Sequence, residues 1–259
     1  MKKNILLLLS ACLLLLSAES YAQKQKSKIK VIAHRGAWKN TGATENSIAA
    51  LKAAIKMRCY GSEFDVHMSS DSVLFVHHDH IIQGKNIEET ASTELSVLKL
   101  ANGENLPTLV AYLKAGKKQN KTRLILEVKP SLVSKERSMI LAEKCVDLVK
   151  SMGLGKMTDY ISFDFDVCKK VKALAPRAEV TYLNGEKSPE EISLAGLSGI
   201  DYPYPSFQKN PQWIKQSHDL KLTTNVWTVN DKAMMDWFIE KKINYITTNE
   251  PELLMQLLR

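Results

Sequence analysis

The stretch KIKVIAHRGAWKNTGATENSIAALKAAIKMRCYGSEFDVHM, residues 28–68, decides the fold. It opens with the apolar run KIKVIAH (28–34), continues with the helical spacing of SIAALKAAIKM (47–57), and closes with the run GSEFDVHM (61–68). Apolar residues three and four apart predict an amphipathic helix, and short apolar runs beside turn residues predict buried strands. The stretch is therefore a predicted strand–helix–strand unit, which is the repeating piece of a parallel sheet.

The same alternation continues to the end of the chain. Six further strand candidates follow, each with a helix candidate after it: TRLILEV (122–128), DYISFDF (159–165), AEVTYL (178–183), GIDYPY (199–204), LTTNVWTV (222–229) and INYITT (243–248). Eight such units in about 230 residues predict a closed (β/α)₈ TIM barrel, with an open doubly wound sheet as the alternative. The segment between HHDH (77–80) and TRLILEV is too long for an ordinary connection, so a short excursion is expected between strands 2 and 3.

Composition bounds the class of protein and its partners. The chain has 259 residues, of which 44% are hydrophobic and 25% charged, and these are ordinary globular proportions. The net charge of +8 favours anionic partners in a general way. The lysines are scattered and lack aromatic interleaving, so no nucleic-acid partner is expected.

The amino terminus is typical of an export signal. Residues 1–22 have a basic start, an apolar run and a small-residue exit, so we predict a signal peptide there and a single domain over residues 23–259. The protein is then exported, either periplasmic or secreted. The alternative is a lipoprotein anchored at Cys12 of LSAC, but the apolar residues that continue after Cys12 argue against it.

The rest of the chain carries neither a membrane span nor a disulfide framework. No stretch after the signal reaches the roughly 18 apolar residues of a spanning helix. Cys59, Cys145 and Cys168 are odd in number and widely spaced, so free, buried thiols are expected.

Charged and polar residues lie at or near the ends of the first three predicted strands: His34 with Arg35, Glu63 with Asp65, and Glu127 with Lys129. In a TIM barrel the catalytic groups lie at these carboxyl ends. Because side chains alternate along a strand, Glu63, Asp65 and His67 share one face. The same alternation places His78 and His80 on one face of the following run and His77 on the other.

Three carboxylates would thus converge inside the barrel, where uncompensated charge is costly. A divalent cation is the simplest group that keeps them ionised, and ligands that are all oxygen favour Ca²⁺ or Mg²⁺ over Zn²⁺. The alternative is that these acids pair with Arg35 and Lys129 as interior salt bridges.

Several short motifs, in order along the chain, resemble the glycerophosphodiester phosphodiesterase family: HRG (34–36), TENS (44–47), SEFDVHMSSD (62–71), HHD (77–79), LPTL (106–109), LILEVKP (124–130), VWTVN (226–230) and ITTNEP (246–251). The resemblance implies a (β/α)₈ barrel that uses Ca²⁺ or Mg²⁺ to cleave glycerophosphodiesters into glycerol 3-phosphate and an alcohol. It also implies that the glycerol 2-hydroxyl attacks phosphorus first, giving a cyclic phosphate that water then opens.

The resemblance further implies a role for each matching residue. Glu63, Asp65 and Glu127 would hold the metal. His34 and His78 would be the general acid and base. Among the substrate-binding residues, Arg35 and Lys129 would neutralise the phosphate, and Trp227 would form an aromatic wall for the glycerol carbons. Glu45 would contact Arg35 and orient it.

The chain departs from the family pattern at three places. Thr44 stands where a proline usually precedes the Glu-Asn pair, HIIQGKN follows HHD in place of an arginine-containing stretch, and Asn249 stands where an aspartate is common. The first two bear on the loops that set headgroup selectivity, and none touches the metal or histidine positions.

Two other functions compete with this interpretation. A lipid phosphodiesterase of the sphingomyelinase D or phospholipase type would need exposed apolar loops at the rim, whereas IIQGKNIEETAS (81–92) is mostly polar. A catalytically inactive barrel that binds headgroups would lack some of the machinery, whereas every matched position is filled.

Overall fold

The computed structural model describes residues 29–259. The predicted signal peptide and the alternative lipid anchor at Cys12 lie outside the described residues, and both stay predictions. Within the described range, no helix is long and apolar enough to cross a membrane.

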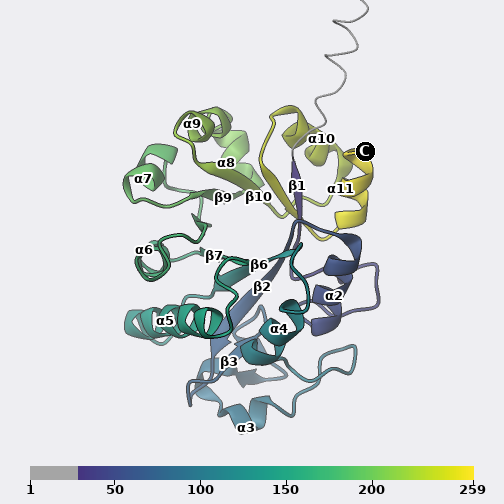
Figure 1. The fold of residues 1–259 in the computed structure, drawn as a ribbon, viewed down its shortest axis with the longest axis vertical. Helices are drawn as coiled ribbons and strands as arrows, with labels where there is room; N and C mark the ends of the chain where they lie inside the picture. Colours follow the sequence, from purple (N-terminus) through teal and green to yellow (C-terminus); the bar gives the residue numbers. More distant parts are fainter. Residues whose placement is uncertain (1–28) are drawn as a thin grey trace, which may run out of the picture.

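Eight parallel strands close into a barrel, as the sequence predicted. They follow the order β1-β11-β10-β9-β8-β7-β6-β2, and β1 also pairs with β2, which closes the ring. Helices surround the barrel on the outside (Figure 1). The barrel strands are β1 (Lys30–Ala33), β2 (Gly61–Met68), β6 (Arg123–Val128), β7 (Thr158–Ser162), β8 (Val180–Tyr182), β9 (Gly199–Pro203), β10 (Thr223–Trp227) and β11 (Tyr245–Thr248).

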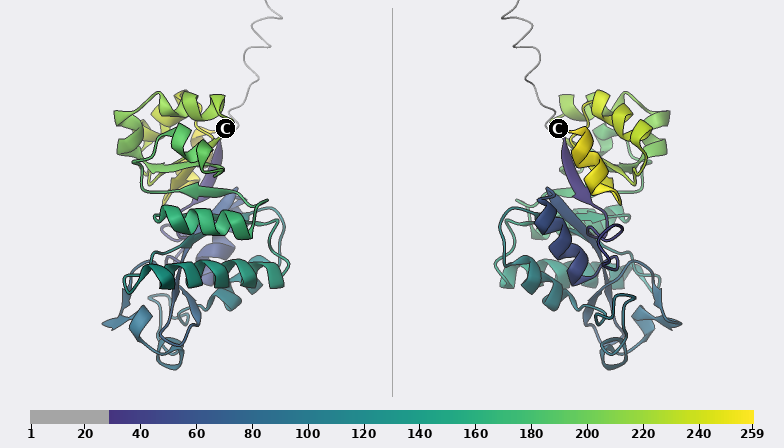
Figure 2. Two further views of the ribbon diagram at one scale, coloured as in Figure 1. Left: turned by 90° about the vertical axis from the view of Figure 1, so that its left-hand side faces the viewer. Right: turned by 90° about the vertical axis from the view of Figure 1, so that its right-hand side faces the viewer.

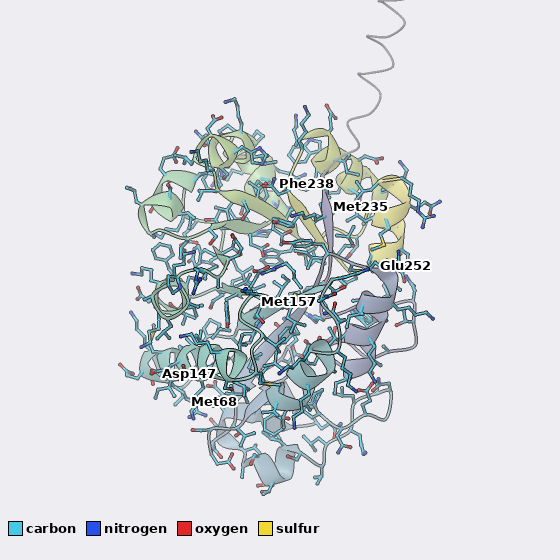
Figure 3. The ribbon with its side chains drawn as sticks, in the orientation of Figure 1. Met68, Asp147, Met157, Met235, Phe238 and Glu252 are labelled. Atoms are coloured by element: carbon cyan, nitrogen blue, oxygen red, sulfur yellow. The ribbon has the colours of Figure 1, made fainter. Side chains whose placement is uncertain are left out.

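The helices begin at the signals that sequence reasoning uses. Ser47 caps α2 by accepting from the Ala50 amide, and Ser188 and Glu191 form a capping box on α7. Met235 and Phe238 of α10 are buried in the core between helices and barrel (Figure 3). The helices that cover the barrel are α2 (Ile48–Met57), α4 (Leu109–Gly116), α5 (Lys135–Ser151), α6 (Phe165–Leu174), α7 (Pro189–Leu194), α8 (Tyr204–Lys209), α9 (Trp213–Asp219), α10 (Lys232–Glu240) and α11 (Pro251–Leu257). Of these, α8 was not predicted.

The two faces of each barrel strand bury different residues. Phe64 and Val66 of β2 point outward into the large core shared with the helices. The inward positions carry a small apolar cluster, made of Ile32, Ile125, Ile161 and Leu183, that fills the barrel. This alternation is the strand period of two, and it leaves the inward positions nearest the carboxyl ends for polar groups.

The predicted excursion lies between β2 and β6 and forms one end of the molecule (Figure 2). It contains β3 (Leu74–Val76), which is antiparallel to β2, the hairpin β4 (Ile81–Ile82) and β5 (Lys85–Asn86), the 3₁₀ turn η1 (Ile87–Glu89), and α3 (Ser92–Leu95). Its own apolar cluster is composed of Phe75, Ile82, Ile87, Leu95, Leu100 and Leu106.

One arginine ties the excursion to the barrel. Arg137 of α5 donates to the carbonyl oxygens of Met68 (2.9 Å) and Ser69 (2.5 Å), where β2 ends. Its Nε also lies 3.3 Å from a carboxylate oxygen of the buried Glu88. The excursion is therefore fixed at its base.

The three cysteines of the described range, Cys59, Cys145 and Cys168, are free and buried, which confirms that expectation.

Candidate active site

Three carboxylates meet inside the barrel at the carboxyl ends of β2 and β6. Asp65 and Glu127 are register partners on these neighbouring strands, and Glu63 lies one inward position below Asp65. All three residues are buried, and one oxygen from each lies within 4.8 Å of the others. We call Glu63, Asp65 and Glu127 the acidic triad.

Crowding and burial disfavour the charged form of two members of the triad. Burial and the neighbouring charges of Asp65 and Glu127 raise the pKa of Glu63 well above its usual value. Burial and Asp65 raise the pKa of Glu127 to about 8. Burial alone would also raise the pKa of Asp65, but the Lys129 ammonium and a hydrogen bond from the Asn46 amide (2.8 Å) lower it.

Lys129 partly compensates the triad. Its Nζ lies 2.9 Å from Glu127 Oε1 and 3.3 Å from Asp65 Oδ1, so the salt-bridge alternative holds for these two acids. It does not account for Glu63, whose Oε1 is buried without a hydrogen-bond partner among the described residues. An all-oxygen set with an unpartnered carboxylate oxygen fits a hard divalent cation, so the triad could hold one.

The HRG turn brings Arg35 against the triad. Arg35 has a left-handed φ of 55°, and its amide donates to Glu63 Oε2 at 2.7 Å. The guanidinium pairs with Glu45 at 2.9 Å and lies 4.0 Å from Asp65. Gly36 follows at φ 79°, where a Cβ would lie 2.6 Å from that of Ala50, so only glycine fits this turn.

His34 is held neutral beside the triad. Its Nδ1 donates to the Asn249 side-chain oxygen at 2.8 Å, which leaves the Nε2 lone pair 3.9 Å from Glu63 Oε2. Burial, and then the Arg35 charge, lower the pKa of His34 to about 4. At neutral pH this imidazole can therefore accept a proton.

His78 lies at the mouth of the same pocket, and its ring is one-third exposed. Its Nδ1 donates to Asp79 Oδ1 at 2.7 Å. The His78 carbonyl accepts from His67 Nε2 at 3.1 Å. His67 therefore holds the backbone of the HHD segment (77–79) and does not line the pocket.

The prediction that His80 faces the same way as His78 is wrong, because His78 lines the pocket and His80 does not. The His80 ring packs edge-on against His67 at 4.6 Å and its Nδ1 lies 3.6 Å from Glu88, away from the pocket. The reason is that β3 ends at Val76, so strand alternation does not extend to residue 80.

An open pocket lies beside the triad, and His78 is the one residue of the excursion in its lining. Trp227 and Phe163 form an apolar wall, with ring centroids 5.5 Å apart and an interplanar angle of 82°. The Trp227 indole donates to the carbonyl of Asp201 at 2.9 Å, which fixes the plane of the ring. The pocket thus joins a charged end to an aromatic one.

The structure brings together all nine site residues that the sequence singled out, either in the pocket or directly behind it. Sequence reasoning missed three residues of the site, Asn46, Phe163 and Asp201. It also missed the hydrogen bond between Asn249 and His34. Strand alternation on β7 and β9 would have identified Phe163 and Asp201, and TENS contains Asn46. The departure at Thr44 also has a contact, because its hydroxyl accepts from the Asn102 amide at 2.9 Å and ties this loop to the excursion.

Barrels with charged groups gathered at the carboxyl ends of their strands are enzymes of the TIM-barrel class. Comparison with known proteins narrows the class. Residues 34–253 match the Glycerophosphoryl diester phosphodiesterase family. The chain belongs to this family and is a phosphoric diester hydrolase.

Individual relatives agree over nearly the whole chain. A glycerophosphodiester phosphodiesterase of Caldanaerobacter subterraneus is 27% identical, covering 90% of this chain and 98% of its own. The crystal structure of a glycerophosphodiester phosphodiesterase from Parabacteroides distasonis is 48% identical, covers 90% and 98% of the two chains, and has a TM-score of 0.88. An Oleispira antarctica phosphodiesterase, solved with its product sn-glycerol-3-phosphate, shares the fold at 21% identity and a TM-score of 0.75, with 88% and 95% coverage.

Proposed function

We propose that this protein hydrolyses glycerophosphodiesters to glycerol 3-phosphate and an alcohol, using a divalent cation and the pair His34 and His78. The observation that carries the proposal is the acidic triad, with its unpartnered Glu63 oxygen, lying beside a neutral His34 at one end of an open pocket. The family and the named activity of two relatives support it.

The acidic triad is the proposed cation site, and its all-oxygen ligands favour Ca²⁺ or Mg²⁺. When bound, the cation supplies positive charge that polarises the phosphoryl oxygens. Arg35 and Lys129, which border the triad, add positive charge on the same side of the pocket.

The two histidines have surroundings suited to opposite tasks. His34 is buried, neutral and anchored through Nδ1, so its Nε2 is the proposed base that takes the proton from the attacking hydroxyl. His78 lies at the mouth of the pocket with its ring one-third exposed, and its Nδ1 donates to Asp79 Oδ1. It is the proposed acid that gives a proton to the departing alkoxide.

The attacking group is proposed to be the free 2-hydroxyl of the substrate's own glycerol, with water opening the cyclic phosphate afterwards. The aromatic wall of Trp227 and Phe163 would contact the glycerol carbons. This route excludes intact diacyl lipids, whose 2-hydroxyl is esterified, and points to deacylated headgroup diesters.

The test is release of glycerol 3-phosphate from a panel of glycerophosphodiesters by residues 23–259, with Ca²⁺, Mg²⁺ or chelator. We expect cation-dependent release, which Glu63→Gln abolishes and the matched surface variant Glu143→Gln leaves intact. His34→Gln and His78→Gln should each lower kcat by about 10² to 10⁴, while His218→Gln, on exposed α9, should not. Full activity in chelator would refute the need for a cation, and full activity of His34→Gln would refute the role of His34 as the base.

One observation favours testing intact lipids as well. Ile81 in the excursion and Leu132 and Val133 after β6 are 58%, 73% and 58% exposed, so this side is less polar than the sequence suggested. Cleavage of intact lysolipid or sphingomyelin vesicles, with glycerophosphodiesters left untouched, would replace the proposal with the lipid phosphodiesterase alternative.

We also propose that the protein is exported. Intact mass measurement of the protein from its natural host would show a chain beginning at Gln23. A lipid-modified chain beginning at Cys12 would support the lipoprotein alternative, and an unprocessed amino terminus would contradict both.

A further inference from the structure

Asp201 is a buried acid in the pocket that the proposed mechanism does not use. It lies on β9, is 3% exposed, and borders the pocket together with Trp227 and Leu183. Its Oδ1 is buried and has no hydrogen-bond partner among the described residues. A buried carboxyl oxygen without a partner is costly, which calls for an explanation.

The strand places this side chain inside the barrel. Its neighbours Ile200 and Tyr202 point outward into the core shared with the helices, so Asp201 points inward. No salt bridge reaches it from residues 29–259, and burial raises its pKa to about 7, opposed by a hydrogen bond with the Asn225 side chain that leaves Oδ1 without a partner. The backbone of the same residue holds the Trp227 indole, so the carboxyl and the aromatic wall are fixed relative to each other.

The pocket therefore has two polar regions of different kinds. Arg35, Lys129 and the acidic triad form a charged region that suits a phosphate. Asp201 lies on the same lining among Leu183, Ile161 and Trp227, within electrostatic reach of Glu127, and a carboxyl held in this apolar wall suits a neutral hydroxyl. A substrate with a phosphate at one end and a hydroxyl at the other matches this arrangement.

We propose that Asp201 binds the terminal hydroxyl of the substrate's glycerol and sets the selectivity of the pocket for glycerol diesters. The inference rests on the proposed function and deepens it. The headgroup, which varies between substrates, is then left on the open side, while the constant glycerol takes the buried side. Because the contact involves the hydroxyl that does not attack, Asp201 affects recognition and leaves proton transfer to other groups.

Asp201 also borders a second cavity toward the amino ends of the strands, with Asn225 and Glu179 in its lining. Asp201 could serve only water in that cavity, and the experiment must separate the two roles. Glu179 lines the lower cavity and not the pocket, so Glu179→Gln is a matched control.

The experiment compares two substrates that both keep the attacking hydroxyl. Glycerophosphocholine has the terminal hydroxyl, and 2-hydroxypropyl phosphocholine lacks it. For the wild-type protein we expect kcat/KM to be roughly 10- to 100-fold lower with the second, the range of a hydrogen bond to a charged group. Asp201→Ala should lower kcat/KM by a similar factor with glycerophosphocholine, mainly through KM, and leave the second substrate nearly unchanged. Asp201→Asn, which keeps an acceptor, should restore part of the loss.

Equal losses with both substrates in Asp201→Ala would overturn the inference and favour a structural or water-binding role, while the proposed function stands. If the wild-type protein cleaves neither substrate, the proposed function fails and the inference fails with it. A second measurement needs no variant. Glycerol 3-phosphate should inhibit the wild-type protein at least tenfold more tightly than 2-hydroxypropyl phosphate, which lacks only the terminal hydroxyl, and equal inhibition would overturn the inference even if Asp201→Ala does not fold.

Discussion

Cation binding should weaken steeply as the pH falls from 8 to 6, because Glu127 must lose a proton to become a ligand. In the cation-free protein, burial and the Asp65 carboxylate raise the pKa of Glu127 to about 8. Below that pH the cation competes with a proton for the same oxygens. The apparent affinity therefore rises with pH and levels off only above the raised pKa.

The magnitude follows from the fraction of Glu127 that is ionised. A group with a pKa of about 8 weakens the apparent affinity by a factor of about 100 at pH 6 and about 2 at pH 8. The expected change is thus about 50-fold, or about 2.3 kcal/mol. Glu63, whose pKa is also raised, acts in the same direction, so 50-fold is the lower bound.

The assay is calorimetric titration of the chelator-treated protein with Mg²⁺ and Ca²⁺ at pH 6, 7 and 8. Each titration is repeated in two buffers of different ionisation enthalpy, so that proton release is counted directly. Glu127→Gln should bind weakly at every pH, and the surface variant Glu143→Gln should match the wild-type protein. An affinity constant within twofold between pH 6 and 8, with no proton release, would show that Lys129 already keeps Glu127 ionised and would refute the reasoning.

Four further outcomes are expected. The free energy of unfolding of the cation-free protein should fall as the pH rises from about 4.5 to about 8, because Glu127 keeps its proton in the folded state and has lost it in the unfolded state. Denaturant titration across this pH range measures the fall. Lys129→Met removes the ammonium between two buried acids and should cost about 3 to 5 kcal/mol in chelator, less with cation; chemical unfolding measures both. Asn249→Asp places a negative charge beside Nδ1 of the His34 ring, so it should raise the pKa of His34 and move the acidic limb of the pH profile of kcat/KM to higher pH. An unchanged acidic limb would contradict the contact between His34 and residue 249. Phe75→Ala leaves a cavity in the apolar cluster of the excursion. It should lower the free energy of unfolding by about 3 to 5 kcal/mol and speed hydrogen exchange in the excursion.

The barrel was predictable because its information is local. Each strand and helix has its own period, and eight repeats of one unit allow few other closed arrangements. The helix α8 escaped because YPSFQK (204–209) begins directly after β9, inside the predicted strand GIDYPY, and has no side-chain cap, whereas the equally short α7 has a capping box. The position of His80 escaped because alternation holds only while the strand continues, and β3 ends before it.

For the site, the sequence predicted which strand ends carry charge but not what lies across the barrel. Glu63 and Asp65 follow from the period of β2, whereas the bond between His34 and Asn249 joins positions 215 residues apart and exists only once β1 and β11 pair. The unpartnered state of Asp201 is also invisible in sequence, because it depends on what every neighbouring strand fails to provide.

Burial and the neighbouring acids raise the pKa values of two members of the acidic triad, Glu63 and Glu127, and the formal charge of the site shows what those two protons do. The triad and Glu45 bring four negative charges, and Lys129 and Arg35 bring two positive ones, so the fully ionised cluster has a formal charge of −2. Such a cluster would repel an anionic diester. Two protons, held by Glu63 and Glu127, restore neutrality in the cation-free protein. A divalent cation brings the same two charges, so cation binding should release up to two protons and leave the site's net charge unchanged. Lys129 and Arg35 supply two of the positive charges in this balance, so a site proposed to hold a cation can also keep a lysine 2.9 Å from one of its proposed ligands.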